Sequence, residues 1–155
     1  MFDRAAAIKY AEKWAFSFNP IYYNFSNLGG DCTNFVSQCL YAGNIPMNFL
    51  INGWYYLGLN DRAPAWTGVD EFANFGLNNK SIGFKLFECD KKEIEVADVI
   101  QLGNERRFYH TVLVNRVVKV NGETKIYVTA HDNAVFDFPI ENYGAKIIKY
   151  YKVSE

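Results

Sequence analysis

The chain contains three cysteines and two histidines, and the position of one cysteine favours nucleophilic chemistry. Cys32 follows Gly29 and Gly30 and opens a segment with the apolar spacing of a helix. The free N–H groups and the dipole at a helix N-terminus stabilise negative charge, so they lower a thiol pKa and increase the reactive thiolate. The same N–H groups can bind the oxyanion that forms on an attacked carbonyl. Cys32 is therefore the candidate nucleophile.

The other two cysteines carry no such signal. Cys39 lies inside the same helix, away from its N-terminus, and is interpreted as a small core residue. Two helical turns separate it from Cys32 by about 10 Å, which excludes a disulfide between them. Cys89 lies near the end of an expected strand, among charged residues and without an evident partner.

His110 and His131 are the only histidines, so any histidine chemistry uses one or both of them. The pair Asn121-Gly122 predicts a two-residue hairpin loop. If the ladder runs from it without a bulge, His110 lies opposite Asn133, with His131 its diagonal neighbour on one face. His110 is then the candidate base and His131 the group that orients it, with Asn133 as a helper. Asp132 would point to the other face and is a further candidate for that orienting role.

Apolar spacing predicts helices in the first half of the chain and strands in the second. The expected helices cover residues 4–18, a stretch from Asp31 or Cys32 to Gly43, and a third helix that Thr67 caps. Its expected buried stripe is Val69, Phe72, Ala73 and Leu77. The expected strands cover residues 84–87, 98–102, 109–120, 124–130 and 146–153. This order predicts an α+β fold in which N-terminal helices pack on an antiparallel β-sheet.

Composition excludes several classes of function. At 155 residues the chain is expected to form a single domain, 1–155, with no metal or other cofactor. The formal net charge of −1 gives no electrostatic footprint for nucleic acid. No run of eighteen apolar residues predicts a membrane span, and the charged first twenty residues do not form a signal peptide. Cysteine and histidine are too few and too dispersed for a paired-ligand zinc site.

Aromatic residues make up 17% of the chain and gather in the irregular stretch 47–65, which is interpreted as a long loop. Trp54 and Trp66 are therefore candidates for lining a substrate groove, where aromatic faces stack on sugar rings and peptide planes. The alternative is that both tryptophans are core residues that pack beneath and against the third helix. The sequence leaves the two interpretations open.

The segment from Gly29 to Gln38, GGDCTNFVSQ, resembles the nucleophile motif of the bacterial putative amidase domain family. That family is a branch of the papain-like cell-wall cysteine peptidases and amidases, related to NlpC-type and CHAP-type domains. Further similarity covers residues 54–56, 65–69, 97–101, 109–112 and 128–131, so the resemblance extends over nearly the whole chain.

The resemblance implies a papain-like fold, with the nucleophile at a helix N-terminus and the base on the sheet. Cys32, His110 and His131 match the family order of cysteine, histidine and a polar third residue. In CHAP-type relatives an acidic residue and an asparagine lie in the region of His131 and Asn133, so the third residue stays open. Further candidates for the oxyanion site or the substrate groove are Asp31 and the upstream residues Tyr22, Tyr23 and Asn24.

The implied function is a cysteine amidase or peptidase that cleaves amide bonds in bacterial peptidoglycan, as a lysin-type catalytic domain does. Its partner would be a stem peptide or muropeptide, and it would act outside the cell or in the cell wall as a monomer or as part of a modular protein. Because no signal peptide is expected in this sequence, the protein would reach that location by release during phage-driven lysis, or the sequence would be a truncated form. The alternatives are an acyl transferase on the same scaffold and a cell-wall-binding module without catalysis.

Overall fold

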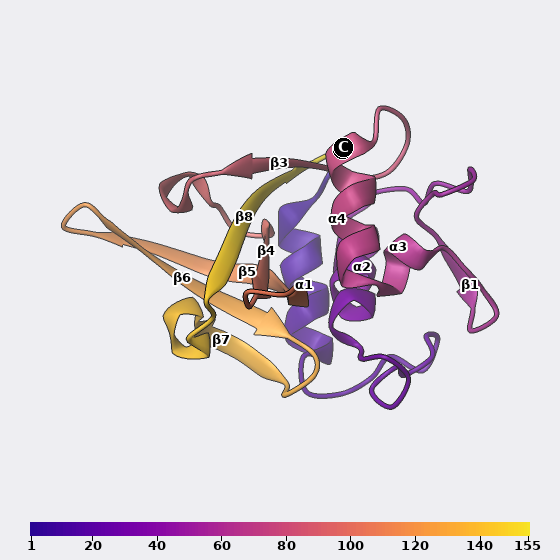
Figure 1. Cartoon of the computed structure of the whole chain (residues 1–155), viewed down its shortest axis with the longest axis horizontal. Coiled ribbons are helices and arrows are strands. Elements are labelled where there is room, and N and C mark those ends of the chain that lie inside the picture. The colour runs from indigo at the N-terminus through magenta and orange to yellow at the C-terminus, as the bar shows by residue number, and fades with distance from the viewer.

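Four α-helices form in the first half of the chain (Figure 1). The computed structural model describes all 155 residues. The helices are α1 (Arg4–Trp14), α2 (Cys32–Ala42), α3 (Pro64–Thr67) and α4 (Val69–Asn78). The Asp3 carboxylate accepts a hydrogen bond from the Ala6 N–H at 3.0 Å, which caps α1 as its sequence predicts. α1 ends four residues before the predicted end, because residues 15–17 form a turn and a bend.

The second half of the chain forms an antiparallel sheet, as predicted. Its strands are β3 (Lys85–Cys89), β4 (Val99–Gly103), β5 (Phe108–Val120), β6 (Glu123–Ala130), β7 (Val135–Pro139) and β8 (Ile147–Ser154). Their order is β3-β8-β4-β5-β6-β7, and every neighbouring pair is antiparallel. Two short 3-10 helices, η1 (Lys91–Glu93) and η2 (Ile140–Tyr143), lie between strands. The α+β prediction is confirmed.

Several elements differ from their predictions. A small ribbon of β1 (Tyr56–Gly58) and β2 (Asp61–Arg62) lies within the stretch expected to be a loop, and β7 was not predicted. Thr67 ends α3 and does not cap α4, which starts at Val69 without a side-chain cap. Leu77 is 46% exposed, because the buried face of α4 passes through Gly76. A Cβ at Gly76 would come within 2.5 Å of Leu86, so glycine allows α4 to approach β3 closely.

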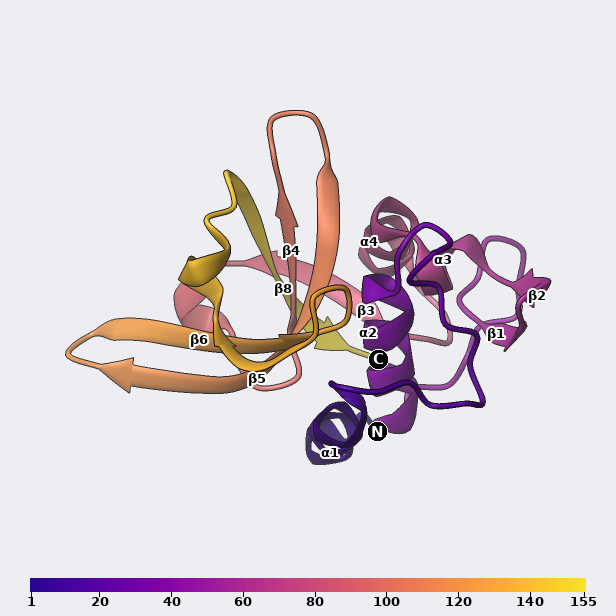
Figure 2. The same cartoon turned by 90° about the horizontal axis from the view of Figure 1, so that it is seen from below.

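The helices gather on one side of the sheet, and the main core lies between the two (Figure 2). Val99 and Leu113 of the sheet belong to this core, together with apolar side chains of α1, α2 and α4. Val112 and Val114 belong to a second apolar cluster. Because successive residues of a strand point to opposite faces, both faces of the sheet are packed. No helix has the length and apolar character needed to cross a membrane.

A β-bulge at Asn115 changes the register of the long β5–β6 hairpin. From the turn to Arg116 the pairing follows the prediction, but beyond the bulge Val114 pairs with Val128. The amide of Asn115 exchanges hydrogen bonds with Asp137 of β7, at 3.2 Å to the carboxylate and 3.1 Å from the backbone N–H. The neighbouring strand therefore holds the extra residue in place.

This bulge overturns the predicted placement of the two histidines. A shift of one residue reverses the face on which every later side chain lies. Continued past the end of β6, the observed register brings Asp132 opposite His110, where the unbroken ladder predicted Asn133. His131 then falls on the other face. The prediction that the histidines are neighbours on one face is wrong.

Candidate functional site

Cys32 is the first residue of α2 and follows two glycines with left-handed backbone conformations. The φ angles are 85° at Gly29 and 102° at Gly30. A Cβ on Gly30 would also lie 2.8 Å from a carboxylate oxygen of Asp132. Glycine is therefore required at position 30 both by its φ angle and by the close approach of Asp132.

Asp132 caps the N-terminus of α2 from a loop about one hundred residues farther along the chain. Its two carboxylate oxygens accept hydrogen bonds from the Asp31 N–H at 2.9 and 2.8 Å. One of them, Oδ2, also accepts from the Cys32 N–H at 3.1 Å. The backbone N–H that the sequence assigned to a substrate oxyanion is thus bound to a carboxylate of the protein itself.

The Cys32 side chain is only 6% exposed, and its burial raises the pKa of the thiol. The backbone N–H of Thr111 and the hydroxyl of Thr33, which lies 3.7 Å from Sγ, act in the opposite direction. The charge of Asp132 adds to the increase. The predicted lowering of the thiol pKa is therefore wrong for this structure, because burial disfavours the thiolate and Asp132 adds a negative charge at the N–H groups that would have stabilised it.

His110 lies in β5 and is 7% exposed. Its ring packs edge-on against Tyr143 of η2, with ring centroids 5.5 Å apart. Burial lowers the pKa of His110, and the negative charge of Asp132 opposes this effect. The imidazole is therefore neutral at pH 7 and can accept a proton. It makes no hydrogen bond with Sγ of Cys32 in this structure.

Tyr143 completes a group that we call the thiol cluster: Cys32, His110, Asp132 and Tyr143. Burial raises the pKa of Tyr143 to about 12, and the neighbouring Cys32 contributes to the increase when it is charged. Its hydroxyl is buried without a hydrogen-bond partner. Tyr143 was not among the predicted site residues, because no motif or spacing around it in the sequence indicates a site.

His131 is held by α1 and α2 and does not touch His110. Its Nδ1 lies 2.5 Å from Oδ2 of Asp31, and its Nε2 lies 2.8 Å from the carbonyl oxygen of Trp14. The ring stacks on Phe35 at a centroid distance of 4.0 Å. Both ring nitrogens are thus engaged, one with a carboxylate and the other with a backbone carbonyl. Neither nitrogen is left to orient another side chain.

Asp31 forms the other half of this buried pair. Its second oxygen, Oδ1, accepts hydrogen bonds from the Phe25 N–H at 2.8 Å and from the Asn34 side chain at 2.9 Å. With His131 on Oδ2, the carboxylate has three partners and is 1% exposed. The pair fixes the start of α2, and through it the backbone of Cys32.

The upstream candidates are engaged in packing and turns. Tyr22 stacks on Trp66, with ring planes 17° apart and centroids 6.1 Å apart. The N–H of Tyr23 donates to the Tyr56 hydroxyl at 2.7 Å. The Asn24 side chain accepts from the backbone two residues later and closes a turn. None of the three forms a hydrogen bond with Cys32.

Trp54 and Trp66 are both fully buried, with ring centroids 4.8 Å apart. Each indole N–H donates to a side chain of α2 at 2.9 Å, Trp54 to the Ser37 hydroxyl and Trp66 to the side-chain amide oxygen of Asn34. The groove interpretation of these two residues is therefore wrong, and the core interpretation is confirmed. Through these hydrogen bonds the two tryptophans hold the polar side chains of α2 in place.

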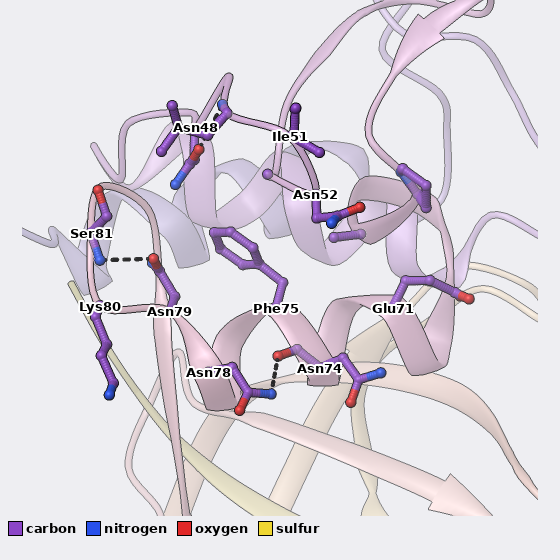
Figure 3. A pocket seen from close by; sticks show the side chains of 14 residues that line it. Asn48, Ile51, Asn52, Glu71, Asn74, Phe75, Asn78, Asn79, Lys80 and Ser81 are labelled. Carbon is purple, nitrogen blue, oxygen red and sulfur yellow. Dashed lines mark hydrogen bonds between the residues drawn. The ribbon is translucent and has the colours of Figure 1, made fainter.

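Two clefts are open on the surface. The first has a volume of about 480 Å³ and is lined by residues 15–18 and 131–134, with Ser26 and Gly30. Its lining therefore includes Asp132 and the exposed Asn133. The second, of about 470 Å³, lies between residues 48–53 and α4 (Figure 3). It contains no member of the thiol cluster. No group of three or more His, Cys, Asp or Glu side chains could hold a metal ion.

Fold and site together define an α+β protein in which a cysteine begins the second helix and a buried histidine lies in the antiparallel sheet. The family model described as "Putative amidase domain" matches residues 1–153. The chain belongs to this family, and membership indicates amide hydrolysis as its class of activity.

Two curated proteins of Bacillus subtilis strain 168 are similar to the chain. The uncharacterized protein YhbB is 35% identical over 119 residues, which cover 73% of this chain and 37% of YhbB. The uncharacterized protein YjcM is 28% identical over 151 residues, which cover 91% of this chain and 33% of YjcM. The chain thus spans about a third of the length of either relative. No solved structure matches the chain.

Proposed function

We propose that this protein is a papain-like, cysteine-dependent hydrolase that cleaves amide bonds of bacterial peptidoglycan. The observation that carries the proposal is the thiol cluster, in which Asp132 binds the N–H of Cys32 at 3.1 Å and its charge acts on the neutral, buried His110. Membership of the putative amidase domain family supports the amide bond as the target. The proposed site of action is the cell wall, outside the cell.

In the proposed reaction, His110 accepts the proton of the Cys32 thiol while Sγ attacks the amide carbonyl carbon. The resulting tetrahedral intermediate collapses, and the leaving amine takes its proton from His110. Water then hydrolyses the thioester with His110 again acting as the base. Because burial raises the pKa of the thiol, the thiolate forms together with proton transfer and does not exist beforehand.

Asp132 is the proposed partner of His110, since its charge favours the protonated imidazole that forms during the reaction. His131 is proposed as a positioning residue that acts through Asp31 and the start of α2. Asn133 lies exposed at the edge of the first cleft, where it would contact substrate.

The decisive experiment is digestion of purified Gram-positive peptidoglycan, with the soluble fragments identified by mass spectrometry. The wild-type protein should release fragments whose new termini identify the amide bond, and the Cys32→Ala variant should release none. Cys89→Ala is the matched control, because it removes a free thiol outside the thiol cluster and should leave the activity unchanged. Equal digestion by wild type and Cys32→Ala would refute the role of Cys32.

A further inference from the structure

The hydroxyl of Tyr143 is the only buried side-chain nitrogen or oxygen atom in the structure without a hydrogen-bond partner. Burying a hydroxyl without a partner is unfavourable, so native structures rarely contain one, and each needs an explanation. The ring itself is well packed, edge-on against His110 at 5.5 Å and against Phe138 at 4.9 Å. Packing therefore accounts for the ring but not for the hydroxyl.

This hydroxyl belongs to the same cluster as the candidate nucleophile. The ring of Tyr143 contacts His110, and the thiolate of Cys32 lies close enough to raise the pKa of Tyr143 electrostatically. Since that pKa is about 12, the hydroxyl keeps its proton at neutral pH. Tyr143 is therefore a protonated hydrogen-bond donor whose ring packs against His110, the candidate base.

The reaction proposed above needs such a donor. When Sγ bonds to the carbonyl carbon, the electron pair of the C=O π bond moves to oxygen, and this oxyanion must be stabilised. The N–H of Cys32 would serve in the simplest scheme, but Asp132 accepts from it at 3.1 Å. The Asp31 N–H is also bound to Asp132. The N–H groups of Asp31 and Cys32 are thus both bound to the Asp132 carboxylate in this structure.

We infer that Tyr143 is a catalytic residue that donates its O–H hydrogen bond to the oxyanion of the tetrahedral intermediate. This inference rests on the proposed function of Cys32. The proton stays on the Tyr143 oxygen throughout. As the intermediate collapses, the oxygen electron pair re-forms the C=O bond, the C–N bond breaks, and the amine leaves with a proton from His110. The substrate carbonyl is then the missing partner of the orphaned hydroxyl.

The test compares two thiol reagents, of which one reacts through an oxyanion and the other does not. p-Nitrophenyl acetate acylates a thiol through a tetrahedral intermediate, whereas iodoacetamide alkylates it by direct displacement at carbon. Tyr143→Phe keeps the packed ring and removes the hydroxyl. Tyr150→Phe is the matched control, since Tyr150 packs against the same second apolar cluster. Both variants are made in the Cys89→Ala background, and Cys32→Ala defines the contribution of Cys32.

We expect Tyr143→Phe to slow Cys32-dependent acylation by roughly 10²-fold, the effect of removing one oxyanion donor. Alkylation should stay within about twofold of wild type, and the urea midpoint should not fall, because no hydrogen bond is lost. Tyr150→Phe should change none of the three. Unchanged acylation in Tyr143→Phe would refute the role of Tyr143, while the role of Cys32 as the nucleophile would stand. A parallel loss of acylation and alkylation would also refute it, since that indicates a displaced thiol.

The proposed nucleophile has its own outcome in the same experiment. If the wild-type protein and Cys32→Ala react alike with both reagents, Cys32 is not a nucleophile, and the inference about Tyr143 falls with it. Cys32-dependent acylation in the wild type, with or without an effect of Tyr143→Phe, leaves the nucleophile standing.

Discussion

Replacing Asp132 by asparagine should make the Cys32 thiol more acidic and more reactive. In the structure the Asp132 carboxylate binds the Cys32 N–H at 3.1 Å, and its charge raises the pKa of the thiol. Asparagine has a similar shape but no charge. The substitution therefore removes the repulsion between Asp132 and the thiolate while leaving burial, the larger cause of the raised pKa, in place.

The expected size follows from the geometry. Sγ is three bonds from the Cys32 nitrogen, so the two charges lie about 6 Å apart. At an effective dielectric constant of about 40, between the surface value of about 20 and that of water, their repulsion is about 1.4 kcal/mol. This corresponds to a factor of about ten in the ionisation constant of the thiol. The thiolate fraction at pH 7 then rises about tenfold. Because a more acidic thiol gives a less nucleophilic thiolate, the alkylation rate should rise by only about threefold.

The assay is the rate of alkylation by iodoacetamide between pH 6 and pH 11, in the Cys89→Ala background. The midpoint of the rate profile should move down by about one unit in Asp132→Asn. Asp70→Asn is the control, because it makes the same chemical change in the first turn of α4, outside the thiol cluster. An unchanged or higher midpoint in Asp132→Asn would show that Asp132 does not suppress the thiolate, and the electrostatic account would be wrong.

Three further predictions concern the neighbours of this site. Replacing His131 by alanine leaves Asp31 without its buried partner, so the free energy of unfolding in urea should fall by about 3–5 kcal/mol, and a loss below about 1 kcal/mol would contradict a stabilising role of this buried pair. Because burial lowers the pKa of His110, its neutral form is retained to lower pH, and the acid limb of Cys32-dependent acylation should have its midpoint below 6.5; a midpoint above 6.5 would exclude His110 as the base. Trp54→Phe removes the hydrogen bond to Ser37 and should cost about 1–2 kcal/mol of stability. The rate of Cys32 alkylation should not change, and a change in that rate would show that Trp54 affects the site as well as the core.

The sequence predicted the arrangement of helices and strands because local signals governed it. Asp3 caps α1, two glycines precede α2, and Asn121-Gly122 forms the expected turn. These features depend on residues adjacent in the chain, where spacing and turn chemistry are informative. The placement of Cys32 at a helix N-terminus was predictable for the same reason.

The partners in the site were not predictable, because they depend on a single extra residue in a strand. The bulge at Asn115 exchanges the faces of His131 and Asp132, and nothing in the local pattern of the strand indicates it. Its support comes from Asp137, in a strand that the sequence did not predict. Tyr143 is likewise defined only by tertiary contacts. Long-range geometry therefore decided the chemistry around Cys32.

The bonds between the start of α2 and the loop after β6 also bear on how the protein matures. Asp31 meets His131, and Cys32 meets Asp132, across 100 residues of chain in each case. Contacts between residues so far apart in sequence form late in folding, after most of the chain has been made. An unfinished chain that lacks this loop would carry an exposed, ordinary thiol at Cys32. The speed at which a probe ceases to react with that thiol would therefore time the last steps of folding.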